Sequence, residues 1–134
     1  MLLLQNGRVI DPKSGLDQVM DLVTDDKKIL EIGNDLKEKH PDARVIDATG
    51  LVVAPGFIDV HVHFRDPGLE YKETIETGCL AAAHGGYTTV CPMPNTKPST
   101  DCPEVVKEVL DKASAACGVH VLPVGAVTVG QKGE

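Results

Sequence analysis

The pattern of residues 56–124 constrains the fold most, because short β-branched runs alternate there with stretches of helical periodicity. Glycines follow both helical stretches, as they commonly do just past a helix end. The expected elements are a strand at 57–64, a helix at 70–84, a strand at 87–91, a helix from Asp101 to Gly118 and a strand at 119–124. Glu104 completes a capping-box pattern with Asp101. Such alternation with short links predicts βαβ units and a parallel sheet.

A closed (β/α)8 barrel of the TIM type has eight such units and about 250 residues. This chain has 134 residues, and the expected units end after the third strand. We therefore interpret residues 56–134 as the first strands and helices of an incomplete (β/α) barrel. The fold class is α/β, and we expect the chain to be truncated.

Residues 1–55 have a different character, with brief apolar runs separated by turn residues such as Asn6-Gly7 and Asp25-Asp26. The expected strands lie at 2–4, 8–10, 19–24, 29–32 and 44–46. Five short strands predict a small antiparallel β layer. One such layer cannot bury both of its faces, so it needs a partner sheet or domain. We place the boundary between the two domains, 1–55 and 56–134, beside Pro55.

Composition and charge exclude several functions. The net charge is −7 and the basic residues are scattered, so we expect no nucleic-acid partner. No apolar stretch approaches the roughly 20 residues of a membrane helix, and no basic leader precedes the apolar start. We therefore expect a cytoplasmic protein without membrane attachment. The four cysteines, expected to be reduced thiols, lie far apart at Cys79, Cys91, Cys102 and Cys117.

Polar residues alternate with apolar ones just before the Asp66-Pro67-Gly68 break. Side chains two apart share a face of a strand, so Asp59, His61, His63 and Arg65 are expected to line one face. Imidazoles on a core-facing side are costly unless a partner satisfies them, and neutral imidazole is a good zinc ligand. The plain alternative is a chance His-x-His pair on a solvent-facing edge. Asp59 could orient an imidazole or bond to a turn backbone, with neither favoured.

A proline-rich loop, Cys91-Pro92-Met93-Pro94-Asn95-Thr96-Lys97-Pro98, follows the second expected strand of the barrel. Each proline fixes φ, so the loop should be stiff and could hold Asn95 at the same barrel end as His61 and His63. An amide beside the Arg65 guanidinium suits a carboxylate and an adjacent carbonyl. A plain turn is the alternative.

The stretch from His61 to Gly68, together with Met93-Pro94-Asn95-Thr96, resembles the signature of the dihydroorotase family in the metal-dependent amidohydrolase superfamily. The resemblance implies that His61 and His63 bind the more buried of one or two zinc ions. It implies that Arg65 and Asn95 bind the carboxylate of dihydroorotate, with His63 nearby. The implied reaction is reversible hydrolysis to N-carbamoyl-aspartate in pyrimidine biosynthesis.

The resemblance also implies what these residues leave out. The family's other metal ligands and its proton-shuttle aspartate come from later strands, so no catalytic residue is assigned in this portion. Lys132 lies in a loop-like stretch and is not assigned as a ligand. The fragment alone is expected to be inactive. Family members pair their N-terminal strands with C-terminal ones in a composite β-sandwich, which would complete the layer of residues 1–55.

Three alternatives remain open. Hydantoinases and allantoinases, which are other cyclic amidohydrolases, share the His-x-His pair. A dihydroorotase-like subunit without catalysis could serve as a partner of aspartate transcarbamoylase. A truncated product could pair with another copy, and a homo-oligomer is expected in any case. The remaining histidines have plain structural interpretations, Cys79 and Cys117 are expected in packing, and Cys91 is the cysteine nearest the site.

Overall fold

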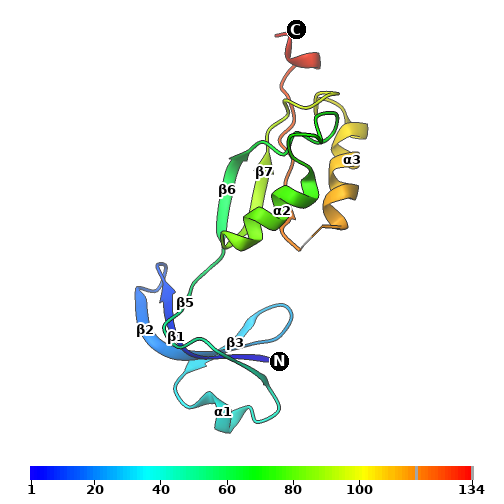
Figure 1. Cartoon of the computed structure of the whole chain (residues 1–134). Helices are drawn as coiled ribbons and strands as arrows, with labels where there is room; N and C mark the ends of the chain where they lie inside the picture. The colour runs from blue at the N-terminus through cyan, green and yellow to red at the C-terminus, as the bar shows by residue number, and fades with distance from the viewer. Residues whose placement is uncertain (117, 134) are drawn as a thin grey trace. The chain divides into compact units, whose positions relative to one another are not determined.

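The computed structural model describes residues 1–116 and 118–133. The chain divides into two compact units, Met1–Pro55 and Gly56–Glu134 (Figure 1). Each unit has its own cluster of buried apolar side chains. Within the described residues, no helix has the length and apolar character needed to cross a membrane.

The first unit is a five-stranded mixed sheet. Its strands are β1 (Leu2–Asp11), β2 (Leu16–Thr24), β3 (Ile29–Gly33), β4 (Arg44–Asp47) and β5 (Val52–Val53), with the short helix α1 (Leu36–Lys39) between β3 and β4. The order is β3-β2-β1-β4, and β5 also pairs with β1. The first three strands are antiparallel, whereas β4 and β5 run parallel to β1. The expectation of a purely antiparallel layer was therefore wrong, because α1 and its flanking loops return the chain to the start of β1.

The two strands expected at 2–4 and 8–10 form one strand, β1, with a register shift between Leu4 and Gly7. Asn6 adopts a positive φ of 62°, and its N–H donates to Asp21 Oδ1 across 2.9 Å. Asn-Gly therefore makes a β-bulge here rather than a turn. The other Asp21 oxygen accepts from the Leu36 N–H at 3.1 Å, so one buried carboxylate supports both the bulge and α1.

The second unit is a three-stranded parallel sheet with two helices. Its elements are β6 (Phe57–Val62), α2 (Ile75–His84), β7 (Tyr87–Pro92), α3 (Pro103–Ser114), β8 (His120–Val121) and the 3-10 helix η1 (Val129–Gln131). The strand order is β6-β7-β8. Helix α2 contacts β7 and lies beside α3, and α3 contacts β8 (Figure 1). The expected alternation of strand and helix and the parallel sheet are present.

Apolar side chains from all of these strands and helices except η1 pack between the sheet and the helices. Phe64, Ile75, Cys79, Val90, Val109, Val119 and Val121 form this core, with Val62 packed against it. Cys79 is completely buried, as expected for a packing residue. The expectation for Cys117 lies outside the described residues.

Several element boundaries differ from expectation. Helix α2 begins at Ile75 rather than near residue 70, because Thr74 and Thr77 form a reciprocal capping box. Helix α3 begins at Pro103, which lacks an N–H and suits the first helical position, so Asp101 makes no capping box. It ends at Ser114, before Gly118. Strand β8 is two residues long, although the N–H groups of Leu122 and Val124 still bond to β7 at 2.9 and 3.0 Å.

Candidate active site

The predicted site residues lie at the carboxyl ends of β6 and β7. His61 is on β6, His63 follows its last residue, and Asn95 lies in the loop after β7. The Met93 N–H donates to the Val62 carbonyl across 2.8 Å, so the chain leaving β7 stays beside the end of β6. We name residues 93–100 the Asn95 loop and residues 65–69 the Arg65 loop. Carboxyl ends of parallel strands are where active sites gather in (β/α) folds.

The His61 and His63 rings are neighbours, with centroids 5.2 Å apart and planes at 68°. His63 Nδ1 lies 2.9 Å from Asn95 Oδ1. Because an amide oxygen only accepts, Nδ1 of His63 carries the hydrogen. The Nε2 lone pair of a neutral His63 ring is then available as a metal ligand.

The histidine pair suits a zinc ion in chemistry and accessibility, since both imidazoles are exposed. Across the described residues, 1–116 and 118–133, no group of three or more His, Cys, Asp or Glu side chains could hold a metal ion. A zinc site in a protein commonly has three or four protein ligands. The described residues therefore offer a pair of neighbouring imidazoles, which is fewer ligands than such a site needs.

Asp59 does not orient an imidazole by hydrogen bonding. Its Oδ1 accepts from the backbone N–H of His61 across 3.0 Å. The pairing of β6 with β7 is irregular between Asp59 and Val62, and the carboxylate serves as an acceptor within that stretch. Asp59 therefore bonds to the backbone instead of orienting an imidazole, and the bond lies within β6 rather than in a turn.

Arg65 does not share a strand face with His61, because β6 ends at Val62. Arg65 has a positive φ of 60°, and its carbonyl accepts from the Leu69 N–H at 2.9 Å. Between the histidines and this turn, Phe64 is buried against Gly78 of α2. The alternation continues through Phe64, which is buried in the core beside Val62. The turn at Arg65 ends it, so the expectation that Arg65 lines the same face as the histidines was wrong.

The Arg65 loop and the Asn95 loop contact each other through their backbones. The Lys97 N–H donates to the Pro67 carbonyl across 3.0 Å. Gly68 has a φ of +90°, and a Cβ there would lie 1.7 Å from the Lys97 carbonyl oxygen. Only glycine combines this backbone conformation with this approach. The two loops that carry the predicted substrate-binding residues therefore have a fixed separation.

Hydrogen bonds hold the Asn95 loop in addition to its prolines. The Pro94 carbonyl lies 2.8 Å from Gln131 Nε2, 3.0 Å from Ser99 Oγ and 3.1 Å from the Thr100 N–H. Gln131 comes from the segment after β8, and a neighbouring bond joins the Gly130 N–H to Asp101 Oδ2 at 2.6 Å. Sequence reasoning missed Gln131, because no local pattern relates it to a loop 37 residues earlier.

The Arg65 loop has charged neighbours that sequence reasoning also missed. Glu70 Oε1 accepts from the Gly68 N–H at 2.7 Å, and this bond is the main reason that the pKa of Glu70 lies below its ordinary value. Asp66 is buried and contacts Lys112 of α3. The sequence separation of 46 residues between Asp66 and Lys112 carries no motif that could have indicated the pair.

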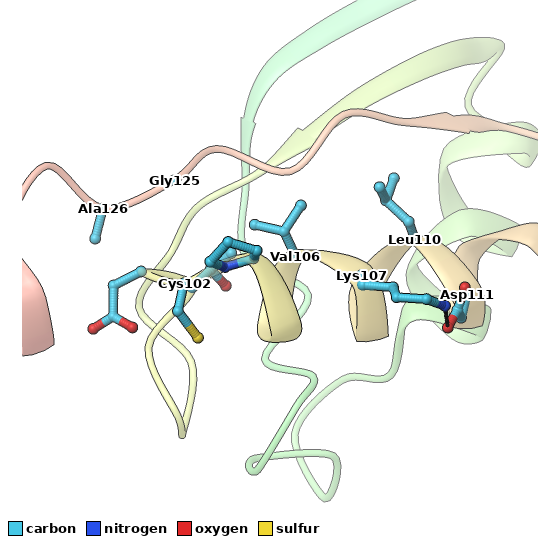
Figure 2. A pocket seen from close by; sticks show the side chains of 10 residues that line it. Cys102, Val106, Lys107, Leu110, Asp111, Gly125 and Ala126 are labelled. Atoms are coloured by element: carbon cyan, nitrogen blue, oxygen red, sulfur yellow. Dashed lines mark hydrogen bonds and ion pairs between the residues drawn. The ribbon is translucent and has the colours of Figure 1, made fainter.

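Two hollows in the described part of the second unit bear on the location of the candidate site. The larger, of about 570 Å³, is lined by α3 and the segment after β8, and Val106 and Leu110 point from α3 toward the chain that runs from β8 to Gly125 (Figure 2). None of the predicted site residues is among its lining residues. A smaller hollow of about 270 Å³ is lined by Asp59, His63 and Glu73 with the α2 face. The candidate site, chosen by the chemistry of its residues, therefore lies beside the smaller hollow and not the larger one.

The remaining histidines have structural positions. His84 is the last residue of α2 and His120 the first of β8. His40 Nε2 lies 3.0 Å from Glu31 Oε2 in the first unit. Cys91 is partly buried near the end of β7, and Lys132 follows η1. Cys91 and Cys102 form no disulfide in the described part of the chain.

Known proteins resemble the chain in sequence and fold. The dihydro-orotase-like family model matches residues 50–134. The dihydroorotase of Geotalea daltonii is 52% identical over 133 residues, covering 99% of this chain and 31% of that protein. The dihydroorotase of Streptococcus thermophilus is 52% identical over 134 residues, covering 100% of this chain and 31% of that protein.

Solved structures of hydantoinases have a similar fold. The L-hydantoinase (dihydropyrimidinase) from Arthrobacter aurescens has a TM-score of 0.79 and 31% identity, covering 93% of this chain and 27% of that one. The D-hydantoinase (dihydropyrimidinase) from Thermus sp. has a TM-score of 0.75 and 35% identity, covering 95% and 28%. The fold and the paired histidines at a strand end place the chain in the amidohydrolase class. Within it, the chain belongs to the dihydro-orotase-like family. It spans about a third of the length of the dihydroorotases it matches.

Proposed function

We propose that this chain is the N-terminal portion of a zinc-dependent dihydroorotase. The whole enzyme would catalyse reversible hydrolysis of dihydroorotate to N-carbamoyl-aspartate in de novo pyrimidine biosynthesis. The observation that carries the proposal is the meeting of His61, His63 and Asn95 at two adjacent strand ends, with His63 hydrogen-bonded to Asn95. A sequence identity of 52% to two dihydroorotases, over nearly the whole of this chain, supports the proposal.

In this proposal, residues 56–134 are the first strands and helices of a (β/α)8 barrel, and residues 1–55 are a segment of a composite β-sandwich. Exposed apolar side chains on both units support such neighbours, because large apolar surfaces are usually covered. Those of the first unit include Val19, Ile29, Leu30, Val45, Ile46 and Val52, and those of the second include Leu110, Leu122, Val124, Val127 and Val129.

His61 and His63 would hold zinc, one ion or the more buried of two. Hydrogen bonding of His63 Nδ1 to Asn95 supports this role, because it leaves Nε2 as the electron-pair donor. When bound, zinc would polarise the amide carbonyl and lower the pKa of a water molecule. Residues outside this chain would complete the metal site and move the proton, so this portion alone is expected to be inactive.

Arg65 and Asn95 would bind the carboxylate of dihydroorotate, with His63 beside them. Asn95 Oδ1 accepts from His63, so its Nδ2 group has two N–H donors for a substrate oxygen. The Arg65 guanidinium adds a positive charge and a planar pair of donors. A bound carboxylate would distinguish dihydroorotate from hydantoins, which is why we favour dihydroorotase over the hydantoinase function of the structural relatives.

The whole enzyme would act in the cytoplasm on a small molecule, as a homo-oligomer, with aspartate transcarbamoylase as a candidate partner. A non-catalytic partner subunit is the second candidate function. The presence of His61, His63, Arg65 and Asn95 favours the enzyme over this second candidate.

A chimaera tests the proposal. Residues 1–134 would replace the matching stretch of the Geotalea daltonii dihydroorotase, 52% identical to this chain. We expect the chimaera to hydrolyse dihydroorotate and Arg65→Met to lower kcat/KM at least 100-fold. Arg8→Met is the matched control, because Arg8 is an exposed arginine paired with Asp17 in the first unit. Hydrolysis of hydantoin without dihydroorotate, or unchanged turnover in Arg65→Met, would overturn the substrate assignment.

A further inference from the structure

A buried carboxylate lies directly beside Arg65 in the chain. Asp66 has 7% of its surface exposed, and its two oxygens have different partners. Oδ1 lies 2.5 Å from the Lys112 ammonium in the last turn of α3, and Oδ2 accepts from the Ile75 N–H, 3.3 Å away at the start of α2. The residue after Arg65 is therefore held by both helices of the second unit.

The contact with Lys112 is the only ion pair that the described residues give Asp66. A carboxylate with so little water around it needs such a partner, because a buried charge without one is strongly unfavourable. Removing the ammonium would therefore favour movement of Asp66 toward solvent. The N–H of Ile75 alone is a neutral donor and is a weaker partner than a charged one.

Lys112 is well suited to remain charged. Its ammonium also lies 2.9 Å from Glu108 and 3.8 Å from Glu70. Burial lowers the pKa of Lys112, but hydrogen bonds to Asp66 and Glu108 outweigh burial and raise the pKa above its ordinary value. A cation in the last turn of a helix also interacts favourably with the helix dipole.

The backbone transmits the position of Asp66 to Arg65. Arg65 has a φ of 60°, a backbone conformation that residues other than glycine seldom adopt without support. The support consists of the Leu69 N–H bond to the Arg65 carbonyl, the Gly68 N–H bond to Glu70 and the burial of Asp66. Release of Asp66 would let the Arg65 backbone relax and would change the direction of the guanidinium.

We propose that Lys112 is a positioning residue for Arg65, acting through the buried Asp66 carboxylate to fix the loop that presents the guanidinium to substrate. The inference rests on the proposed function, in which Arg65 binds the carboxylate of dihydroorotate. Lys112 itself lies on α3 and belongs to neither predicted site loop. A positioning role predicts weaker substrate binding, whereas a purely structural role predicts fewer folded molecules with unaltered KM.

Three variants of the chimaera separate these roles. We expect Lys112→Met to raise the KM for dihydroorotate about tenfold, with kcat changed less than threefold and zinc content unchanged. Lys112→Arg should restore KM to within about threefold, because arginine keeps the charge. Lys107→Met is the matched control, since Lys107 lies on the same helix in an exposed pair with Asp111 (Figure 2). An unchanged KM in Lys112→Met, or an equal rise in Lys107→Met, would overturn the proposal.

Hydrogen exchange of the chain itself gives a readout that is independent of activity. In Lys112→Met, the amides of Gly68 and Leu69 should exchange at least tenfold faster, because the bonds that protect them open with the loop. Sheet amides such as Leu122 should keep their protection. Unchanged Gly68 and Leu69 exchange would overturn the positioning role. A chimaera that does not hydrolyse dihydroorotate would overturn the proposed function, while exchange still decides whether Lys112 holds the loop.

Discussion

The Asn95 amide oxygen and the Nδ1 atom of His63 lie 2.9 Å apart, although 32 residues separate them in the chain. One follows β7 and the other follows β6, so this contact joins two neighbouring strand ends. In the proposed enzyme, this contact would give Asn95 two roles. The oxygen fixes the tautomer of His63, and the nitrogen remains a donor for an anionic ligand.

Replacement of Asn95 should weaken metal binding as well as substrate binding. In Asn95→Ala, His63 loses the acceptor that fixes its hydrogen on Nδ1, and we expect zinc affinity of the chain to fall about tenfold, at the lower end of the usual 10–100-fold range for such partners. Isothermal titration of zinc into the purified chain measures this. Asn34→Ala is the control, because Asn34 is an exposed turn residue of the first unit. Equal zinc affinities for Asn95→Ala and the unaltered chain would contradict the tautomer argument.

Substitution of Gly68 should be far more costly than substitution of another glycine with positive φ. A Cβ at Gly68 would meet the Lys97 carbonyl oxygen, whereas a Cβ at Gly15, with φ +75°, has nothing within 4 Å. We expect Gly15→Ala to lower the free energy of unfolding by about 1 kcal/mol, from backbone strain alone. Gly68→Ala should lower it by about 3 kcal/mol or more, because backbone must also move. Urea unfolding followed by circular dichroism measures both, and equal losses would show that the loops separate easily.

Acid should weaken the Arg65 loop through Glu70. The folded-state pKa of Glu70 lies below 4.5, chiefly because the Gly68 N–H binds the carboxylate. Its stabilisation is therefore fully present above the unfolded-state pKa and is lost as the pH falls through the folded-state pKa. Glu70→Gln should flatten the dependence of the thermal midpoint on pH below about 4.5, the ordinary pKa of the group.

Glu76→Gln is the control for this pH experiment, because Glu76 is an exposed carboxylate in the first turn of α2. Thermal melts of both variants and the unaltered chain from pH 3 to 7 provide the measurement, with that range set by ordinary carboxyl pKa values of roughly 4. Parallel curves for Glu70→Gln and the unaltered chain would contradict the role of Glu70.

Neighbouring residues of α3 should differ in their contribution to stability. Val109 is 2% exposed in the core, whereas Leu110 is 44% exposed beside the hollow in Figure 2. Val109→Ala should lower the free energy of unfolding by about 2 kcal/mol, through lost burial and a cavity. Leu110→Ala should lower it by less, about 1 kcal/mol, since Leu110 keeps 44% of its surface exposed and both residues favour helix. Urea unfolding of the two variants tests this, and a large loss in Leu110→Ala would show that the hollow is closed.

The sequence predicted the order of strands and helices in the second unit because apolar periodicity depends on local burial. It also predicted that His61, His63 and Asn95 come from adjacent strand ends, which follows from parallel pairing. It failed at Arg65, where a left-handed backbone turns the chain three residues after the end of β6. Asp66 and Lys112 were missed for another reason: their pairing depends on how α3 packs, which no short pattern encodes.

The contact between Gly68 and the Lys97 carbonyl has a consequence for protein engineering. A loop graft that changed the Arg65 loop alone would bring new backbone against the old Asn95 loop, at a place with no room for a methyl group. Substrate preference would therefore have to be redesigned by exchanging both loops as one module. With Arg65 and Asn95 binding substrate as proposed, the unit that transfers specificity would be the pair of loops rather than either residue alone.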